Sequence, residues 1–270
     1  MIHRALIPLV SCTRSTAVAT GVRVANKQQL GNKGGVGISF KLAGTSFLFV
    51  NAHLAAHQGE VDKRNGEFAK ISSEIARAMG GDGGGGGGGG GGSKPGSVVE
   101  GGAALGGVVN PLLDCFDNVF WSGDMNYRIN GTRQVVDVLL SRGMHGVLVN
   151  NDQLSLAMKT NAAFEGFSEG PLNFKPTYKF DRGTDDYDSS KKQRIPSWTD
   201  RILYSSSGRR SSSQPPPVLL NYSSANNLRT SDHRPVYGSF RSKIFIEEGE
   251  GYGGEIEGMG LSQSQVCLVS

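Results

Sequence analysis

The sequence predicts a mixed α/β domain, and three observations support this fold class. Short runs rich in β-branched and aromatic residues, typical of strands, alternate with longer stretches of helical periodicity. Polar clusters recur where the predicted strands end, which is how a sheet scaffold builds a functional site. The 270 residues, 37% hydrophobic and 19% charged, suffice for one large domain with a sizeable core.

The first clear strand signal is a hairpin, with strands at residues 36–40 and 46–50 and a turn at 43–45. The next segment, residues 61–79, places its apolar side chains on one stripe at helical spacing, which predicts an amphipathic helix. Later patterns predict strands at 117–121, 199–204, 218–222 and 235–240, and helices at 133–141 and 152–160.

Glycine is concentrated in one place, because ten of the 40 glycines form the run 83–92. Residues 80–107 cannot bury enough apolar surface to offset their ordering entropy, so we expect a disordered surface insertion there. We therefore expect one domain over residues 1–242 that contains this disordered insertion at residues 80–110. Residues 243–270 are expected to form a flexible Gly/Glu-rich tail.

Charge and cysteine content narrow the function classes. The net charge of +4 suits a polyanionic partner: a phosphorylated lipid, an inositol phosphate or a nucleic acid. Three widely spaced cysteines argue against a disulfide framework or a thiolate zinc site and favour a reducing, cytoplasmic compartment. No stretch approaches the ~20 apolar residues that a membrane span needs.

Two motifs place carboxylates beside candidate catalytic partners. Asp124 and Asn126 follow an apolar strand, where a carboxylate could accept a proton from water while an amide holds an oxygen ligand. Asp232 and His233 precede the last strand, and an aspartate beside a histidine can orient it or help bind a metal. Either motif alone is equally typical of an ordinary turn.

Basic residues gather in two further stretches. Residues 191–201 hold four cations beside a tryptophan, and residues 175–179 add two more cations and a phenol. Ammonium groups and guanidinium forks suit clustered phosphates, although each stretch alone is typical of a solvated loop. Residues 31–35 look like a phosphate-cradling loop, but they lack Walker spacing and no helix follows them.

Taken together, six motifs in one order resemble the inositol polyphosphate 5-phosphatases of the endonuclease/exonuclease/phosphatase superfamily. The resemblance covers residues 30–241 apart from the Gly-rich insertion. The motifs are Gly31-Asn32-Lys33-Gly34-Gly35, Asn51-Ala52-His53-Leu54-Ala55-Ala56-His57, Gly123-Asp124-Met125-Asn126-Tyr127-Arg128-Ile129, Pro176-Thr177-Tyr178-Lys179, Arg194-Ile195-Pro196-Ser197-Trp198-Thr199-Asp200-Arg201 and Ser231-Asp232-His233-Arg234-Pro235.

The resemblance implies a DNase-I-like β-sandwich of two sheets flanked by helices, four layers in all. It implies Mg²⁺-assisted hydrolysis of the 5-phosphate by in-line attack of water at phosphorus. On this basis Asp124 activates the water, His53 and His233 donate to phosphate oxygens, and Asp232 steers His233. Asn126 orients the phosphate, and it serves with Asp232 as a metal ligand.

Other positions matching the family are expected to bind the substrate through its remaining phosphates. These are Lys33, Tyr178, Lys179, Lys192, Arg194 and Arg201. The expected partners are phosphoinositide lipids or soluble inositol phosphates, with a membrane surface nearby and no nucleic acid.

The chain departs from the family upstream. Members carry further strands there, including one with the glutamate that binds magnesium, whereas this chain has no acidic residue before Glu60. We therefore expect a fold that is incomplete at its N-terminus, with a sheet edge unpaired and part of the core exposed. We also expect weak or no magnesium-dependent phosphate release from this chain.

The last four residues, Cys267-Leu268-Val269-Ser270, fit the C-a-a-X pattern with a terminal residue preferred for farnesylation. We expect Cys267 to be prenylated, which would associate the chain with a membrane, although one lipid chain gives only marginal attachment.

Three alternatives stay open. A nuclease of the same superfamily would share the strand-end motifs but lack the ring-phosphate set at residues 178–201. A catalytically inactive module could bind phosphoinositides without hydrolysing them. A decaying or wrongly assembled reading frame would have no function.

Overall fold

The computed structural model describes residues 4–23, 29–30, 32–80, 110–205, 215–245 and 264–269. The expected Gly-rich insertion and most of the expected tail at 243–270 lie outside the described residues. Within the described part, no helix combines the length and apolarity needed to cross a membrane.

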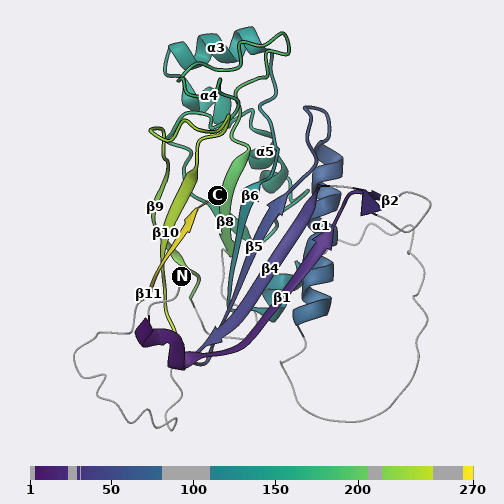
Figure 1. The fold of residues 1–270 in the computed structure, drawn as a ribbon, viewed down its shortest axis with the longest axis vertical. Helices are drawn as coiled ribbons and strands as arrows, with labels where there is room; N and C mark the ends of the chain where they lie inside the picture. Colours follow the sequence, from purple (N-terminus) through teal and green to yellow (C-terminus); the bar gives the residue numbers. More distant parts are fainter. Residues whose placement is uncertain are drawn as a thin grey trace.

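The larger sheet has six strands and carries the candidate site at one end (Figure 1). Only β5 and β6 run parallel, and their neighbours in the sheet are antiparallel. In spatial order the strands are β1 (Val10–Ala19), β4 (Gly34–Leu42), β5 (Thr45–His53), β6 (Asn118–Asp124), β8 (Asp200–Ser205) and β7 (Phe167–Glu169).

A smaller sheet packs against part of the larger one. Its order is β11 (Ser264–Val269), β10 (Val236–Ser242) and β9 (Val218–Ser224), all antiparallel. The Phe240 ring of β10 lies 5.1 Å from the ring of Phe120 on β6 and 5.1 Å from that of Tyr204 on β8. The remaining short elements are a 3-10 helix (Arg4–Leu9) and the two-residue strands β2 (Val22–Arg23) and β3 (Gln29–Leu30).

Helix α1 (Val61–Met79) covers the opposite face of the larger sheet, beside β1 and β4 (Figure 1). Small residues of β4 permit this close packing. A Cβ on Gly37 would lie 2.8 Å from Met79 Cε, and one on Gly35 would lie 2.9 Å from Ile71 Cγ2. The other helices are α2 (Pro111–Cys115), α3 (Arg133–Ser141), α4 (His145–Val149) and α5 (Gln153–Lys159).

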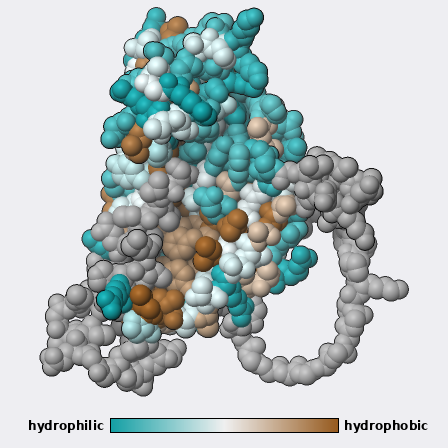
Figure 2. All heavy atoms as spheres, viewed as in Figure 1, coloured by the Kyte–Doolittle hydropathy of each residue, from teal (hydrophilic) through white to brown (hydrophobic). Residues whose placement is uncertain are grey.

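The face of β4 turned away from α1 is only partly covered. Val36 and Ile38 keep 49% and 48% of their surface exposed, although both lie within the six-stranded sheet. Apolar surface occupies the middle of the view in Figure 2, below a hydrophilic end. Among the described residues, this face of β4 therefore keeps part of its apolar surface exposed.

Most of the expected elements are present, including the hairpin, the helix at 61–79 and the strands that follow. Strand β1 was not predicted, because its mixed polar sequence lacks a clear alternating pattern. The expectation of a tail without structure over 243–270 is wrong for Ser264–Val269, which forms β11. There the backbone pairs with the otherwise open edge of β10.

Candidate functional site

Three neighbouring strands bring polar side chains to one end of the larger sheet. The parallel register of β5 and β6 sets His53 opposite Asp124, and the antiparallel register of β6 and β8 sets Asp124 opposite Asp200. Gly123 has φ of +128°, and a Cβ there would lie 2.0 Å from the Ala52 carbonyl oxygen. Only glycine therefore allows β6 to deliver Asp124 this close to β5.

His53 and Asp124 are in direct contact, with His53 Nε2 3.2 Å from Asp124 Oδ2. The Lys33 ammonium also contacts His53 Nε2. Partial burial lowers the pKa of Lys33, although the charges of Asp124 and Glu67 oppose that shift. A carboxylate, an imidazole and an ammonium thus meet at this strand end, as the sequence predicts.

His233 completes the row, but its partner differs from the one expected. His233 Nδ1 lies 2.7 Å from Asp200 Oδ2, whereas the carboxylate of Asp232 accepts a 2.9 Å hydrogen bond from Lys179 Nζ. The expectation that Asp232 steers His233 is therefore wrong. Adjacency in sequence suggested that pair, but consecutive side chains of an extended segment point to opposite faces.

Electrostatics favour the protonated form of His233. Burial works to lower its pKa, but the bond to Asp200 and the charges of Asp200, Asp124 and Asp232 outweigh it and raise the pKa above 6.5. Burial likewise works to raise the pKa of Asp232, and the hydrogen bond from Lys179 leaves that pKa below its ordinary value. His233 can therefore serve as a charged donor to an anion.

Several hydrogen bonds hold the side chain of Asn126 in place. It is 3% exposed, and its Nδ2 donates to the Leu54 carbonyl at 3.0 Å and to Asp124 Oδ2 at 3.1 Å. Its Oδ1 accepts a 2.5 Å bond from the guanidinium of Arg128. The same guanidinium lies over the Tyr178 ring, 4.5 Å from its centroid.

A groove of about 640 Å³ opens beside His233; we call it the substrate groove. Four of the six expected substrate-binding residues line it, whereas Lys33 and Arg201 do not. The Tyr178 ring at its edge lies 4.6 Å from the imidazole of His233. Its charged and phenolic lining comprises Tyr178, Lys179, Arg182, Lys191, Lys192, Arg194, Asp181, Asp188 and Asp232. Five cations against three carboxylates leave an excess of positive charge that suits a ligand with several phosphates.

Arg182 and Lys191 were missed as candidate ligands, although Lys191 lies within the basic stretch that the sequence shows. Asp188 explains how the groove keeps its shape. Its carboxylate accepts the backbone N–H of Arg194 at 2.8 Å and that of Ser190 at 3.2 Å. The loop that carries the cations therefore closes on a single side chain.

Arg201 does not bind substrate, and that expectation is wrong. It is fully buried, with its guanidinium 2.9 Å from Asp152 and 2.5 Å from Glu169. Although burial opposes its charge, the two carboxylates raise the pKa of Arg201 well above its ordinary value. Arg201 follows Asp200 on β8, so its side chain points to the opposite face of the sheet.

Buried polar residues of α1 hold the loop that follows His53, a role that the sequence did not reveal. The Arg64 guanidinium donates to the carbonyls of Ala55 at 3.0 Å and His57 at 2.8 Å. The Glu67 carboxylate accepts from the Ala55 N–H at 2.7 Å. Burial lowers the pKa of Arg64 to about 10. Nothing in the sequence distinguishes these residues from the exposed charges of an ordinary amphipathic helix.

Each predicted metal ligand accepts a hydrogen bond from a neighbouring cation. Magnesium prefers octahedral oxygen coordination with one or two free carboxylates. Here Asn126 Oδ1 is bound by Arg128 and Asp232 Oδ2 by Lys179. Among the described residues, no group of three or more His, Cys, Asp or Glu could hold a metal ion. Asn126 and Asp232 as metal ligands therefore stay a prediction.

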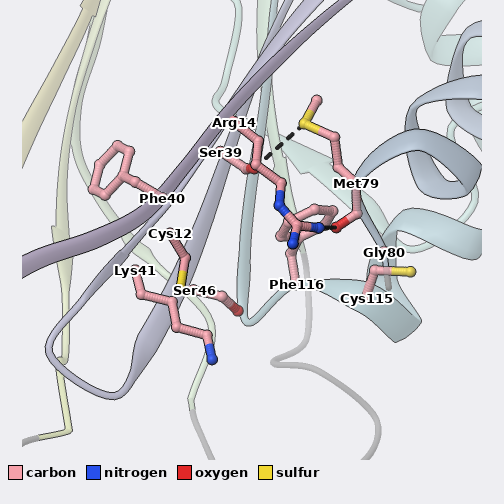
Figure 3. A pocket seen from close by; sticks show the side chains of 10 residues that line it. All are labelled: Cys12, Arg14, Ser39, Phe40, Lys41, Ser46, Met79, Gly80, Cys115 and Phe116. Atoms are coloured by element: carbon pink, nitrogen blue, oxygen red, sulfur yellow. Dashed lines mark hydrogen bonds between the residues drawn. The ribbon is translucent and has the colours of Figure 1, made fainter. Parts of the chain in front are cut away.

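A much smaller cavity, about 60 Å³, lies toward the opposite end of β4 (Figure 3). Cys12 and Cys115 line it from different sides. Arg14 bonds the Met79 carbonyl at 3.3 Å, so this cavity belongs to the packing of the C-terminal end of α1. Neither cysteine contributes to the strand-end site.

Comparisons with known proteins match this geometry. The profile of endonuclease/exonuclease/phosphatase family 2 matches residues 1–239. The phosphatidylinositol polyphosphate 5-phosphatase type IV of Pan troglodytes is 38% identical over 90% of this chain and 34% of its own length. The synaptojanin of Caenorhabditis elegans is 34% identical over 88% of this chain and 18% of its own.

Among solved structures, the inositol polyphosphate 5-phosphatase domain of SPsynaptojanin aligns with a TM-score of 0.65 and 30% identity. The alignment covers 98% of this chain and 58% of that domain, which was solved with inositol (1,4)-bisphosphate and a calcium ion. A Cimex nitrophorin aligns with a TM-score of 0.56 at 24% identity and shares the fold alone. The chain thus spans about a third of the first curated relatives.

Proposed function

Because the chain belongs to endonuclease/exonuclease/phosphatase family 2, we propose that its site binds a phosphorylated inositol and hydrolyses the 5-phosphate. The substrate is the headgroup of a phosphoinositide lipid or a soluble inositol phosphate. The observation that carries this proposal is the placement of the substrate groove directly beside the strand-end row of His53, Asp124, Asp200 and His233.

Phosphoryl transfer depends mostly on positioning and on stabilising charge, and the described residues supply both. Asp124 accepts a proton from the attacking water, and its contact with His53 fixes the orientation of its carboxylate. His233, charged through its bond to Asp200, donates to the phosphoryl oxygens as negative charge develops there. Lys179, Lys192 and Arg194 bind the phosphates that stay on the ring.

A second candidate, binding without hydrolysis, is favoured by one observation. The oxygens expected to hold the magnesium ion accept hydrogen bonds from Arg128 and Lys179. The ring-phosphate contacts require no metal, so such a chain would retain affinity for the headgroup while turning it over slowly.

Phosphate release separates the two candidates. Inositol 1,4,5-trisphosphate and vesicles containing phosphatidylinositol 4,5-bisphosphate are incubated with the parent chain and with Asp124→Ala, with and without magnesium. We expect phosphate release by the parent to be slow, because the chain has no acidic residue before Glu60 to supply the family's magnesium ligand, and to be lost in Asp124→Ala, while both chains bind the headgroup. Binding by both chains without release from either would support the binding module instead. Single-stranded DNA serves as the control substrate, and its cleavage would support the nuclease alternative.

Cys267 as a prenylation site belongs to the same proposal, because a lipid anchor would hold the chain at a membrane that contains its substrate. The C-terminal sequence supports this modification, but β11 restricts access to Cys267. Cys267 pairs with Ser239 of β10, so this strand must leave the sheet before an enzyme can reach it. Intact mass spectrometry of the chain from eukaryotic cells tests this, with Cys267→Ser as the control. A mass with Ser270 retained and Cys267 unmodified would reject it.

A further inference from the structure

A second large groove, of about 600 Å³, lies behind the substrate groove; we call it the rear groove. Phe180 and Arg234 form a wall between the two. Phe180 lines both grooves, while Arg234 lines only the rear one and stacks on the Phe180 ring at 3.9 Å from its centroid. Neither Asp124 nor His233 lines the rear groove, so it lies apart from the catalytic row.

The rear groove is positively charged. Lys175, Arg229 and Arg234 line it, against the single carboxylate of Asp185. Asp185 accepts from Arg229 at 2.5 Å and lies 3.6 Å from Arg234. One carboxylate cannot neutralise three cations, which leaves an excess of two positive charges in the groove before any contribution from histidine.

Several polar groups in the rear groove have unused hydrogen-bonding capacity. His145 Nε2 and Arg234 Nε are shielded from solvent without a hydrogen-bond partner. The side chains of Lys175, Asn173 and Asn227, by contrast, are exposed at the surface of the groove, where their N–H groups can reach a ligand. Buried polar atoms in native proteins are ordinarily satisfied, so these two unpartnered nitrogens beside exposed donors favour a ligand in the groove.

We propose that the rear groove is a second anion site that takes the phosphate group of a small phosphorylated molecule. Lys175 and Arg229 bind the phosphate oxygens, and the amides of Asn173 and Asn227 donate to the same group. The aromatic wall of Phe174, Phe180 and Tyr187 accommodates the apolar part of such a molecule. The volume falls within the range of small-molecule sites.

The test uses inorganic phosphate as the probe and the ¹⁵N-labelled full chain, at ionic strength held constant with sodium chloride. The side-chain amide resonances of Asn173 and Asn227 report on the rear groove, and the Asn126 resonances report on the catalytic row. In the parent chain we expect saturable shifts at Asn173 and Asn227.

Three variants separate the sites. Lys175→Gln/Arg229→Gln should weaken phosphate binding at Asn227 about tenfold or more while leaving the Asn126 response unchanged. Lys179→Gln/Lys192→Gln, which alters only the substrate groove, should leave the Asn227 response intact. Lys63→Gln/Lys159→Gln removes two exposed positive charges outside this groove. It is the matched control, because it changes the net charge by the same amount.

The proposal would be overturned by shifts at Asn227 that never saturate, or by equal weakening in the Lys63/Lys159 control. If the rear-groove double variant does not fold, Asn227→Asp replaces it. This single change places a carboxylate at an exposed turn of the groove, and it must weaken the phosphate response for the proposal to stand.

Discussion

At the residue scale, the pair formed by His233 and Asp200 is the most directly testable feature. Replacing Asp200 with asparagine removes the charge that holds the imidazole in its protonated form. We expect the pKa of His233 to fall in Asp200→Asn, as followed by the imidazole resonances in an NMR titration. An unchanged pKa would mean that Asp200 does not govern this histidine.

The same pair makes stability depend on pH. Because the folded-state pKa of His233 lies above its ordinary value of 6.5, the stability it contributes is fully present below about pH 6.5. That contribution is lost as the pH rises through the raised pKa. Urea unfolding should therefore show a larger gap between the parent and Asp200→Asn at pH 6 than at pH 9. A gap that widens toward high pH would contradict this assignment.

At the scale of single elements, Arg201 ties β8 to β7 and to the start of α5 through Glu169 and Asp152. Arg201→Met leaves two buried carboxylates without their cation, which costs about 3–5 kcal/mol of unfolding free energy. The matched control is Arg229→Met, which breaks an exposed pair and should cost no more than ~1 kcal/mol. Chemical denaturation measures both, and equal losses would argue against a buried structural role for Arg201.

Packing between α1 and β4 provides a second pair of variants. Gly37→Ala would set a Cβ 2.8 Å from Met79, and such overpacking costs ~1–3 kcal/mol. Gly66→Ala, inside α1 with nothing within 4 Å of the added atom, should instead stabilise the helix by ~0.5–1 kcal/mol. Thermal unfolding should give opposite signs, and a gain in stability for Gly37→Ala would contradict the packing described above.

At the scale of the whole molecule, the uncovered face of β4 is the main departure from a closed sandwich. Val36 and Ile38 are about half exposed, so Val36→Thr/Ile38→Thr should change stability by only ~0.5 kcal/mol per substitution. The same variant should bind less of the dye ANS, because that dye reports apolar surface. Equal dye binding by the parent and the variant would show that this face is covered in solution.

The sequence predicted the architecture well where local pattern decides it, and less well where tertiary contacts decide it. The hairpin and α1 follow from alternation and helical periodicity, and Asp124 and His53 were identified by their places at strand ends. Asp200 as the partner of His233 depends on which neighbouring strands pair, which no local pattern shows. Arg201 resembled the other cations of its motif, and only its position on the opposite face of β8 separates it from them.

The most direct measurement of the central claim is calorimetric titration of inositol 1,4,5-trisphosphate into the parent chain and into Lys192→Gln/Arg194→Gln. Each lost charge-assisted contact is worth ~1.5–3 kcal/mol, so the double variant should bind about 10²- to 10⁴-fold more weakly. The control of equal charge, Lys63→Gln/Lys159→Gln, should bind like the parent. If the double variant binds as tightly as the parent, the substrate groove does not hold the ring phosphates and the proposed function is wrong.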